Sequence, residues 1–224
     1  MPDHRTANRV LSGLSRTDFA VLKPNLVPVD LPLLTHLETG NDRIDAVYFL
    51  DSGFASVVAD ASGKRGIEVG LIGREGMTGL AVVMGGDRSP HDTYIQAAGA
   101  GQRVSAAKLR SAMDQSVSLH RSLLRCAHAF LIQATQTALA NGRSKNEERL
   151  ARWLLMADDR IDGGGLPLTH KFLGIMLGVQ RSAVTVAVQA LERKGFIRAG
   201  LRVITIIDRK GLIKMSDGAY LPPD

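Results

Sequence analysis

The residues between Gln180 and Gln189 have the side-chain types that hydrogen-bond to nucleic acids. One side of this segment carries short or forked polar groups with a single formal charge: Gln180, Arg181, Ser182, Thr185 and Gln189. A merely solvated helix face would carry more lysine and glutamate. Arginine can bind guanine through two hydrogen bonds, and short polar groups at a helix N-terminus can reach phosphates. The pattern therefore predicts contacts to base edges and phosphates, and Val186, if exposed, to a thymine methyl group.

The other side of the same segment predicts a buried helix face. Its apolar residues recur at i, i+3, i+4 and i+7, which is the spacing of one face of a helix; they are Val184, Ala187, Val188 and Leu191. A preceding helix is expected to have Thr169 as its N-cap and to run through Leu177. The second helix should begin at about Gln180.

Gly178 lies between the two expected helices and predicts the turn of a helix-turn-helix, because glycine adopts a positive φ at little steric cost. Gly174 is expected where the two helices touch. The positions that should be buried in such a motif are all apolar: Leu173, Leu177, Val179, Val184 and Ala187.

A basic hairpin is expected after the second helix. Two β-like runs flank Ala199-Gly200, and Arg198 and Arg202 bracket that turn. Between Leu166 and Lys214 the chain has nine Lys and Arg residues and two acidic ones, which gives this region a net charge of +7. The rest of the chain has a net charge of −1, and the whole chain has +6. A basic excess confined to one region indicates a polyanionic partner. We expect a wing whose arginines lie against phosphates.

Composition predicts a globular protein of the cytoplasm with no membrane partner. The chain has 224 residues, of which 45% are hydrophobic and 22% charged. Its single cysteine, Cys126, cannot form an internal disulfide, nor hold a zinc ion or an iron–sulfur cluster alone. No apolar run approaches the length of about 18 residues that a membrane span needs. The first ten residues lack the apolar block of a secretory signal.

Short β-forming runs fill residues 20–105. They are AVYFL (46–50), ASVVA (55–59), IEVGLI (67–72) and DTYIQA (92–97), with glycine-containing turns between them. Several short strands at intervals of about ten residues predict an all-β sandwich or barrel.

Residues 106–141 lack proline and change to helical periodicity. Alternating spacings of three and four predict a helix with a narrow seam, formed by Val117, His120, Leu124, Ala127, Leu131, Ala134 and Ala138. A dimer seam and a helix packed on its own domain both fit this pattern. The helix should end at Asn141-Gly142, where we place a domain boundary. A further helix is expected over residues 146–161, with Leu150, Trp153, Leu154 and Ala157 on one face.

Together these motifs resemble the Crp/Fnr superfamily, that of the cyclic-AMP receptor protein and the fumarate–nitrate regulator. The resemblance covers residues from about 10 to 215 and rests on three stretches: residues 46–53 with the Asp60–Lys64 turn, the long helix, and LTHKFLGIMLGVQRSAVTVAVQALERKGFI (168–197). It implies an α+β chain. Residues 1–105 would form a cyclic-nucleotide-binding-like β-roll (a double-stranded β-helix) with an N-terminal helical segment. Residues 106–142 would form a dimerisation helix region, and residues 143–224 a winged helix-turn-helix domain.

The resemblance also implies a bacterial transcription regulator without enzymatic activity. It would act as a homodimer on a pseudo-palindromic operator, with recognition helices 180–194 in major grooves one helical turn apart and RNA polymerase as a further partner. A signal in the β-roll would pass through the long helix. The residues expected at the DNA are Thr169, His170, Lys171, Gln180, Arg181, Ser182, Thr185, Gln189, Arg198 and Arg202.

Two departures from the family pattern bear on ligand and operator. The expected effector pocket includes Gly79, Leu80, Arg88 and Ser89. Leu80 replaces the glutamate that holds the ribose in cyclic-AMP-binding members, and Pro90 follows the Arg-Ser pair that would hold the phosphate. Leucine cannot accept hydrogen bonds from ribose hydroxyls, so we expect no cofactor and an effector other than cyclic AMP, if there is one.

In the recognition helix, Ser182 and Val186 replace a glutamate and a second arginine of the cyclic-AMP receptor protein. The operator should therefore differ from that protein's consensus. A guanine contact by Arg181 is compatible with the sequence.

Two other function classes fit parts of the sequence. A cupin-like β-roll enzyme would need several histidines on adjacent strands, but only His36 and His91 lie in the β region. A ligand-sensing module that acts through protein partners without binding DNA would not need the polar face at 180–189.

Overall fold

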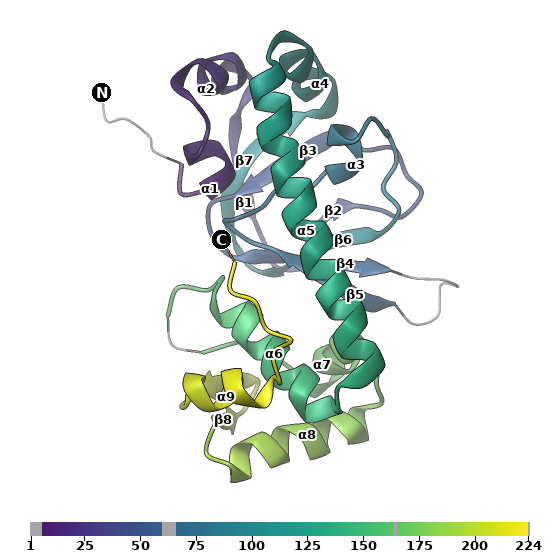
Figure 1. Cartoon of the computed structure of the whole chain (residues 1–224), viewed down its shortest axis with the longest axis vertical. Coiled ribbons are helices and arrows are strands. Elements are labelled where there is room, and N and C mark those ends of the chain that lie inside the picture. The colour runs from purple at the N-terminus through teal and green to yellow at the C-terminus, as the bar shows by residue number, and fades with distance from the viewer. Residues whose placement is uncertain (1–5, 60–65, 164, 224) are drawn as a thin grey trace. The chain divides into compact units, whose positions relative to one another are not determined.

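The computed structural model describes residues 6–59, 66–163 and 165–223. The chain forms two compact units, and Figure 1 labels most of their elements. Unit 1 consists of Met1–Val57 and Ile72–Ile132, and unit 2 of Val58–Leu71 and Gln133–Asp224. Unit 2 is therefore discontinuous in sequence. The expected Asp60–Lys64 turn lies outside the described residues.

The first seven strands form two sheets. One has the order β1 (Val27–Leu31), β7 (Gly99–Ser105), β3 (Ala46–Leu50), with antiparallel pairing throughout. The other has the order β2 (His36–Glu38), β6 (Asp92–Ala97), β4 (Phe54–Ala59), β5 (Ile67–Ile72). β3, β5 and β6 have the predicted bounds, and β4 begins one residue before its prediction.

A hydrophobic core joins the helices of unit 1 to one face of β3. These helices are α1 (Arg9–Ser12), α2 (Arg16–Leu22), the 3-10 turn η1 (Lys23–Asn25), α3 (Leu80–Val83), α4 (Ala106–Gln115) and the first part of α5 (Val117–Arg143). Val47 and Phe49 of β3 are fully buried in this core with Leu22 and Leu109. Because side chains alternate along a strand, Ala46 and Tyr48 point to the opposite face of the sheet.

The C-terminal part of unit 2 consists of four helices and a hairpin. These are α6 (Asn146–Asp158), α7 (His170–Leu177), α8 (Arg181–Arg193), β8 (Ile197–Gly200), β9 (Val203–Ile206) and α9 (Arg209–Met215). The sequence predicted one buried face for α6, but all eight residues from Leu150 to Ala157 are buried. α6 contacts α7, α8 and α9 and is thus the central helix of this part.

The segment Val58–Leu71 is tied to the rest of unit 2 by side-chain hydrogen bonds. Trp153 Nε1 donates to Glu68 Oε1 over 2.5 Å, and Glu68 is buried. The side-chain amide of Gln133 pairs with the backbone of Leu71, accepting from its N–H at 2.6 Å and donating to its carbonyl at 3.0 Å. The indole N–H of Trp153 and the side-chain amide of Gln133 therefore each have a hydrogen-bond partner in this segment.

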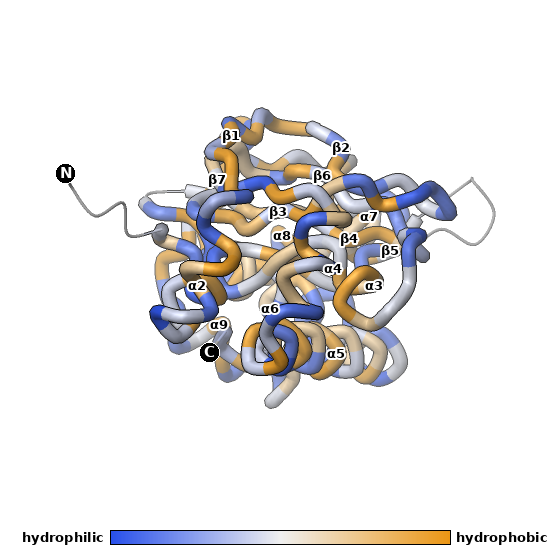
Figure 2. The backbone as a smooth tube through the Cα atoms, turned by 90° about the horizontal axis from the view of Figure 1, so that it is seen from above, coloured by the Kyte–Doolittle hydropathy of each residue, from blue (hydrophilic) through white to orange (hydrophobic). Residues whose placement is uncertain are grey.

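The helices have the alternating hydropathy of half-buried elements. In Figure 2 hydrophobic and hydrophilic residues alternate around the coil of α5. Within the described ranges, no helix combines the length and hydropathy needed to cross a membrane.

The region 106–142 is two helices rather than one. The break is at Ser116, whose backbone is extended with φ −138° and ψ 104°. The Asp18 carboxylate of α2 accepts hydrogen bonds from the hydroxyls of Ser116 (2.5 Å), Ser118 (2.7 Å) and Ser15 (2.7 Å). These bonds, led by the one from Ser116, lower the pKa of Asp18 below its ordinary value. The charged form of Asp18 thus stabilises the junction of α4 and α5.

We expect Asp18→Asn to lower the melting temperature at pH 7. The pKa of Asp18 is depressed by folding, so its contribution is present above the unfolded value of about 4 and is lost as the pH falls through the folded value. The gap between wild type and variant should therefore be constant above about pH 5 and close below about pH 4. Thermal melts across this range measure it. Asp114→Asn, at an exposed aspartate of α4, is the control, and an equal gap there would contradict the assignment.

Candidate nucleic-acid interface

The first helix of the predicted motif begins and ends as expected. Thr169 is its N-cap, and the Thr169 hydroxyl accepts from the backbone N–H of Phe172 at 3.2 Å. α7 ends at Gly178, which has φ 62° and ψ 32° in the left-handed region. The N–H of Gly178 donates to the carbonyl of Ile175. This residue reverses the chain between α7 and α8 in the way a glycine allows.

The two helices approach closely at Gly174. The N–H of Val179 donates to the carbonyl of Gly174 at 3.0 Å, and a Cβ on Gly174 would lie 3.0 Å from the Val179 carbonyl oxygen. On the other side of the turn, a Cβ on Gly178 would lie 2.6 Å from Cδ1 of Ile67 in β5. A Cβ on Gly174 would thus press against the backbone of the turn, whereas at Gly178 it is the positive φ that favours glycine.

α8 has the two faces that its sequence predicted. Val184, Ala187, Val188 and Leu191 are buried, with at most 3% of each residue exposed. Among the other positions expected in the core, Leu173 and Leu177 are buried, but Val179 is half-buried. That prediction was wrong because Val179 lies in the turn, where its backbone rather than its side chain makes the close contact.

The polar face of α8 is open at its N-terminus. Gln180, Arg181, Ser182 and Gln189 are exposed. Thr185 is half-buried, and its hydroxyl donates to the carbonyl of Arg181 at 3.1 Å. Gln180 is the N-cap residue, yet its side chain makes no capping hydrogen bond within the described part of the chain. The first turn of α8 therefore lacks the internal acceptor that Thr169 gives α7, which suits contact with an external anion.

The hairpin forms, with its turn two residues later than predicted. Ala199 and Gly200 belong to β8, and the last cross-strand pair is Gly200 with Val203. The turn is Leu201-Arg202, and Arg202 has a positive φ of 60°. The turn lies later than predicted because Gly200 still pairs with Val203 as part of β8. Arg198 is exposed on β8 and Arg202 is exposed at the tip. Leu166 exchanges two backbone hydrogen bonds with Ile204, which adds an edge to this sheet.

Arg149 of α6 supports the helix-turn-helix and was not identified from the sequence. Its Nη2 donates to the carbonyl of Leu177, the last residue of α7, and thereby satisfies an acceptor that a helix end leaves unpaired. Burial lowers the pKa of Arg149, and its Nε has no hydrogen-bond partner among the described residues. The signal in the sequence was a set of charges inside an apolar run, RLARWLLM.

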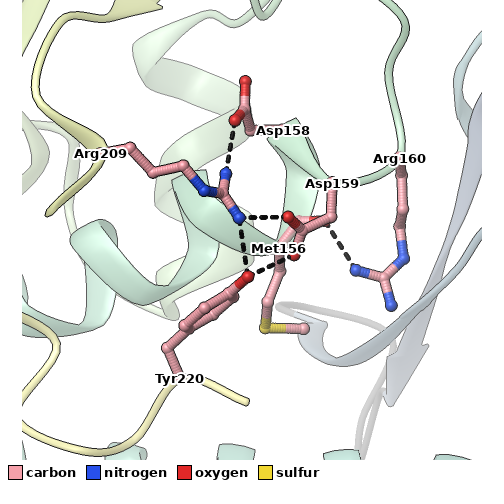
Figure 3. Close-up of polar contacts among 6 residues, drawn as sticks. All are labelled: Met156, Asp158, Asp159, Arg160, Arg209 and Tyr220. Carbon is pink, nitrogen blue, oxygen red and sulfur yellow. Dashed lines mark hydrogen bonds and ion pairs between the residues drawn. The ribbon is translucent and has the colours of Figure 1, made fainter. Parts of the chain in front are cut away.

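Figure 3 shows a second cationic side chain that is used inside the unit. Arg209 of α9 bonds Asp158 at 2.6 Å, Asp159, and the hydroxyl of Tyr220 at 2.8 Å. Tyr220 in turn donates to Asp159 at 2.8 Å. Burial, then the hydrogen bond to Asp159 and its charge, raise the pKa of Tyr220 to about 12. Tyr220 therefore stays protonated and fastens the segment after α9 to the end of α6.

The basic excess of this region is thus partly internal. Arg209 was counted with the nine cationic residues of 166–214, but it belongs to the cluster of Figure 3. Arg181, Arg198 and Arg202 remain exposed. His170 and Lys171 lie in the first turn of α7, and their side chains fall outside the described residues.

Comparison with solved structures gives the fold. FixK2 from Bradyrhizobium japonicum superimposes with a TM-score of 0.73 and 21% identity, over 85% of this chain and 96% of its own. A CRP-family transcriptional regulator from Thermus thermophilus gives a TM-score of 0.72 and 18% identity, over 87% and 99%. A CRP/FNR-family regulator from the same organism gives 0.62 and 22%, over 87% and 99%. No curated protein sequence matches the chain.

Residues 148–215, from α6 to the end of α9, match the family model described as a Crp-like helix-turn-helix domain. The chain has a Crp-like helix-turn-helix domain within the Crp/Fnr fold. This confirms the resemblance stated from residues 168–197 and the predicted fold class. The two Thermus thermophilus proteins are described as transcriptional regulators, and the family model that matches this chain is that of a helix-turn-helix domain. Within the described ranges, no group of three His, Cys, Asp or Glu residues could hold a metal ion.

The seam residues of α5 divide into two sets. Val117, Leu124 and Leu131, spaced by seven, are exposed to 64%, 39% and 61%, and Ala138 continues this line. In contrast, Ala127 is buried and the His120 ring Nε2 lies 2.9 Å from the carbonyl oxygen of Val83. Ala134 is half-buried.

The four residues expected in the effector pocket all lie in unit 1, but they differ in burial and in their hydrogen-bond partners. Gly79 and Ser89 are buried and converge on one side chain, that of Glu38. Leu80 is half-buried, and Arg88 is exposed and bonds a backbone carbonyl elsewhere.

We expect Gly178→Ala to lower the free energy of unfolding by about 1–2 kcal/mol, because a Cβ is disfavoured in the left-handed region. The contact with Ile67 would add to this cost, although the end of that side chain can move. Urea denaturation measures the effect. Gly142→Ala is the control: a Cβ there meets nothing within 4 Å, and alanine favours the helix. Equal stability of the two variants would contradict the role of Gly178.

Proposed function

We propose that the chain is a sequence-specific transcription regulator that binds a pseudo-palindromic operator as a homodimer, with RNA polymerase as a further partner. The observation that carries the proposal is the N-terminal half of α8. Its polar face is exposed, its first turn has no side-chain cap, and its opposite face is fully buried. A rigid helix with these properties can enter a major groove with Arg181 toward a guanine and Gln180 and Ser182 toward phosphates.

The wing supplies contacts that carry no sequence information. Arg202 at the tip and Arg198 on β8 are exposed, and neither lies in the cluster that holds Arg209. Leu201 beside Arg202 is 94% exposed. Such arginines suit phosphates flanking the base contacts. We also propose that the start of α7 contacts DNA phosphates through Thr169, His170 and Lys171, because helix N-termini commonly bind phosphate groups.

The homodimer is proposed to form along the exposed line of α5. Val117, Leu124, Leu131 and Ala138 repeat every seven residues, the period at which helices pack with a constant seam. His120, Ala127 and Ala134 belong to the same predicted seam but are turned more toward their own chain. The proposed interface is therefore narrower than the sequence alone predicted.

Cyclic AMP is not the proposed effector. Leu80 offers no acceptor for ribose hydroxyls, and Arg88 is exposed and donates to the carbonyl of Asn41 at 2.7 Å. Both anchors of a cyclic nucleotide are thus altered, and an unpaired ribose hydroxyl would weaken binding. We propose that operator binding needs no cyclic nucleotide and no cofactor.

Arg181→Ala should weaken specific binding by roughly 1–3 kcal/mol and relax selectivity at one base position. The operator would first be identified by selection from genomic fragments with purified protein at fixed salt. Fluorescence anisotropy against that operator and its single-base variants then measures the effect. An unchanged affinity and selectivity would count against this placement of α8.

One further arginine variant and one lysine variant serve as comparisons in the same assay. Arg202→Ala should weaken all sequences about equally and reduce the dependence on salt, because it removes a phosphate contact. Lys108→Ala removes an exposed charge from α4 and should leave both affinity and selectivity unchanged. A sequence-selective loss with Arg202→Ala would oppose the wing assignment.

Leu124→Glu should raise the dimer dissociation constant at least about tenfold, because an unpaired charge would be buried in the seam. Analytical ultracentrifugation over a concentration series measures this. Leu33→Glu changes an apolar residue that is 56% exposed in unit 1 and should leave the dimer intact. A Leu124→Glu protein that dimerises like wild type would refute this seam.

A further inference from the structure

The carboxylate of Glu38 joins two hydrogen-bond donors of unit 1 that lie far apart in sequence. Its Oε1 accepts from the backbone N–H of Gly79 at 2.5 Å. Its Oε2 lies 2.7 Å from the hydroxyl oxygen of Ser89. One carboxylate oxygen therefore accepts from a backbone N–H, and the other lies within hydrogen-bond distance of a hydroxyl that it shares with a second acceptor. Backbone N–H and hydroxyl groups are the donors that bind small oxyanions in proteins.

Both donors are fixed by the surrounding structure. Gly79 has φ 69°, and a Cβ there would lie 2.3 Å from Cγ2 of Val47, so the backbone at Gly79 packs directly against that side chain. Ser89 is 2% exposed. Its hydroxyl oxygen also lies 2.6 Å from the carbonyl oxygen of His91 and accepts from the His91 N–H at 3.3 Å. The single hydroxyl proton serves either the carbonyl or Glu38, so loss of Glu38 would leave Ser89 with an alternative acceptor.

Glu38 also lines an open pocket of about 190 Å³. The pocket lies over the face of β3 that points away from the hydrophobic core, with Ala46 and Tyr48 on its wall. The ionisable groups around it are two arginines, three carboxylates including Glu38, and a histidine: Arg43, Arg103, Glu38, Asp42, Asp45 and His36. With the histidine neutral, removal of Glu38 changes the formal charge of this lining from −1 to 0.

We propose that Glu38 is a built-in substitute for the anionic group of a ligand: its carboxylate occupies the donors at Gly79 and Ser89, next to the open pocket that Glu38 also lines. The proposal deepens the proposed function, on which it rests for the assignment of Gly79 and Ser89 to the effector pocket. In this proposal Glu38 is the residue that keeps phosphate-containing ligands away from the two donors. A free anion would have to displace a carboxylate that is covalently part of the chain and therefore present at high effective concentration.

Glu38→Ala should convert the site into one that binds small oxyanions. The test is a thermal melt in increasing sodium formate, with sodium chloride keeping the ionic strength constant. We expect a saturable rise of about 3–6 °C at ten times the dissociation constant for Glu38→Ala, and no saturable rise for wild type. Inorganic phosphate and cyclic AMP, tested in the same way, show how large an anion these two donors can accept once Glu38 is removed.

Two further variants give the controls. Glu38→Gln keeps the volume and one acceptor, so it should fold and show no formate response. Glu38→Ala/Ser89→Ala should lose the response, because one of the two donors is gone. If Glu38→Ala is unfolded without added anion, recovery of its folded state by formate is the corresponding expected result.

Three outcomes would overturn the proposal: an equal formate response in wild type, no response in Glu38→Ala while Glu38→Gln folds, or a response that survives loss of Ser89. These melts contain no DNA. A wild-type protein that selects no operator would refute the proposed function and leave this result standing, and the reverse also holds.

Discussion

The close contact between α7 and α8 is the constraint on which the DNA-binding surface depends. α8 is held by burying Val184, Ala187, Val188 and Leu191, and this is possible only if α7 approaches within van der Waals contact at Gly174 and the chain reverses at Gly178. Arg149 then closes the end of α7 from α6. The result is a helix fixed along one whole side, whose opposite side needs no internal partner. Polar residues on that free side can be specialised for recognition without a cost to packing.

Local signals in the sequence were sufficient for much of this architecture. The strands β3, β5 and β6 and the cap, turn and stripe of the helix-turn-helix follow from spacing and residue type, because period and capping act within a few residues. β7 was not predicted, since its GAG opening lacks β-branched residues and the strand is defined by its partners β1 and β3. The wing turn was misplaced for the related reason that cross-strand pairing, rather than the nearest glycine, decides where a hairpin turns.

The side-chain roles that escaped the sequence are those set by distant partners. Arg149 and Arg209 look in the sequence like members of a basic surface, yet one caps a helix and the other holds two aspartates and a tyrosine. Glu38 carries no motif at all, and its partners lie 41 and 51 residues away. Charge counting therefore overstates the cationic surface of this domain, and an acidic residue outside any motif can occupy donors from distant parts of the chain.

The discontinuity of unit 2 limits how this protein can be rearranged. Trp153 and Gln133 find their hydrogen-bond partners at Glu68 and Leu71, in a segment flanked on both sides by the chain of unit 1. A gene fusion or recombination joined at the end of α5 would carry the Crp-like domain away from that segment and leave the indole N–H of Trp153 without its carboxylate. Exchange of this domain between proteins of this fold therefore involves two segments of the chain. The transferred domain must bring residues 58–71 with it, or the receiving protein must already have a carboxylate at the position of Glu68.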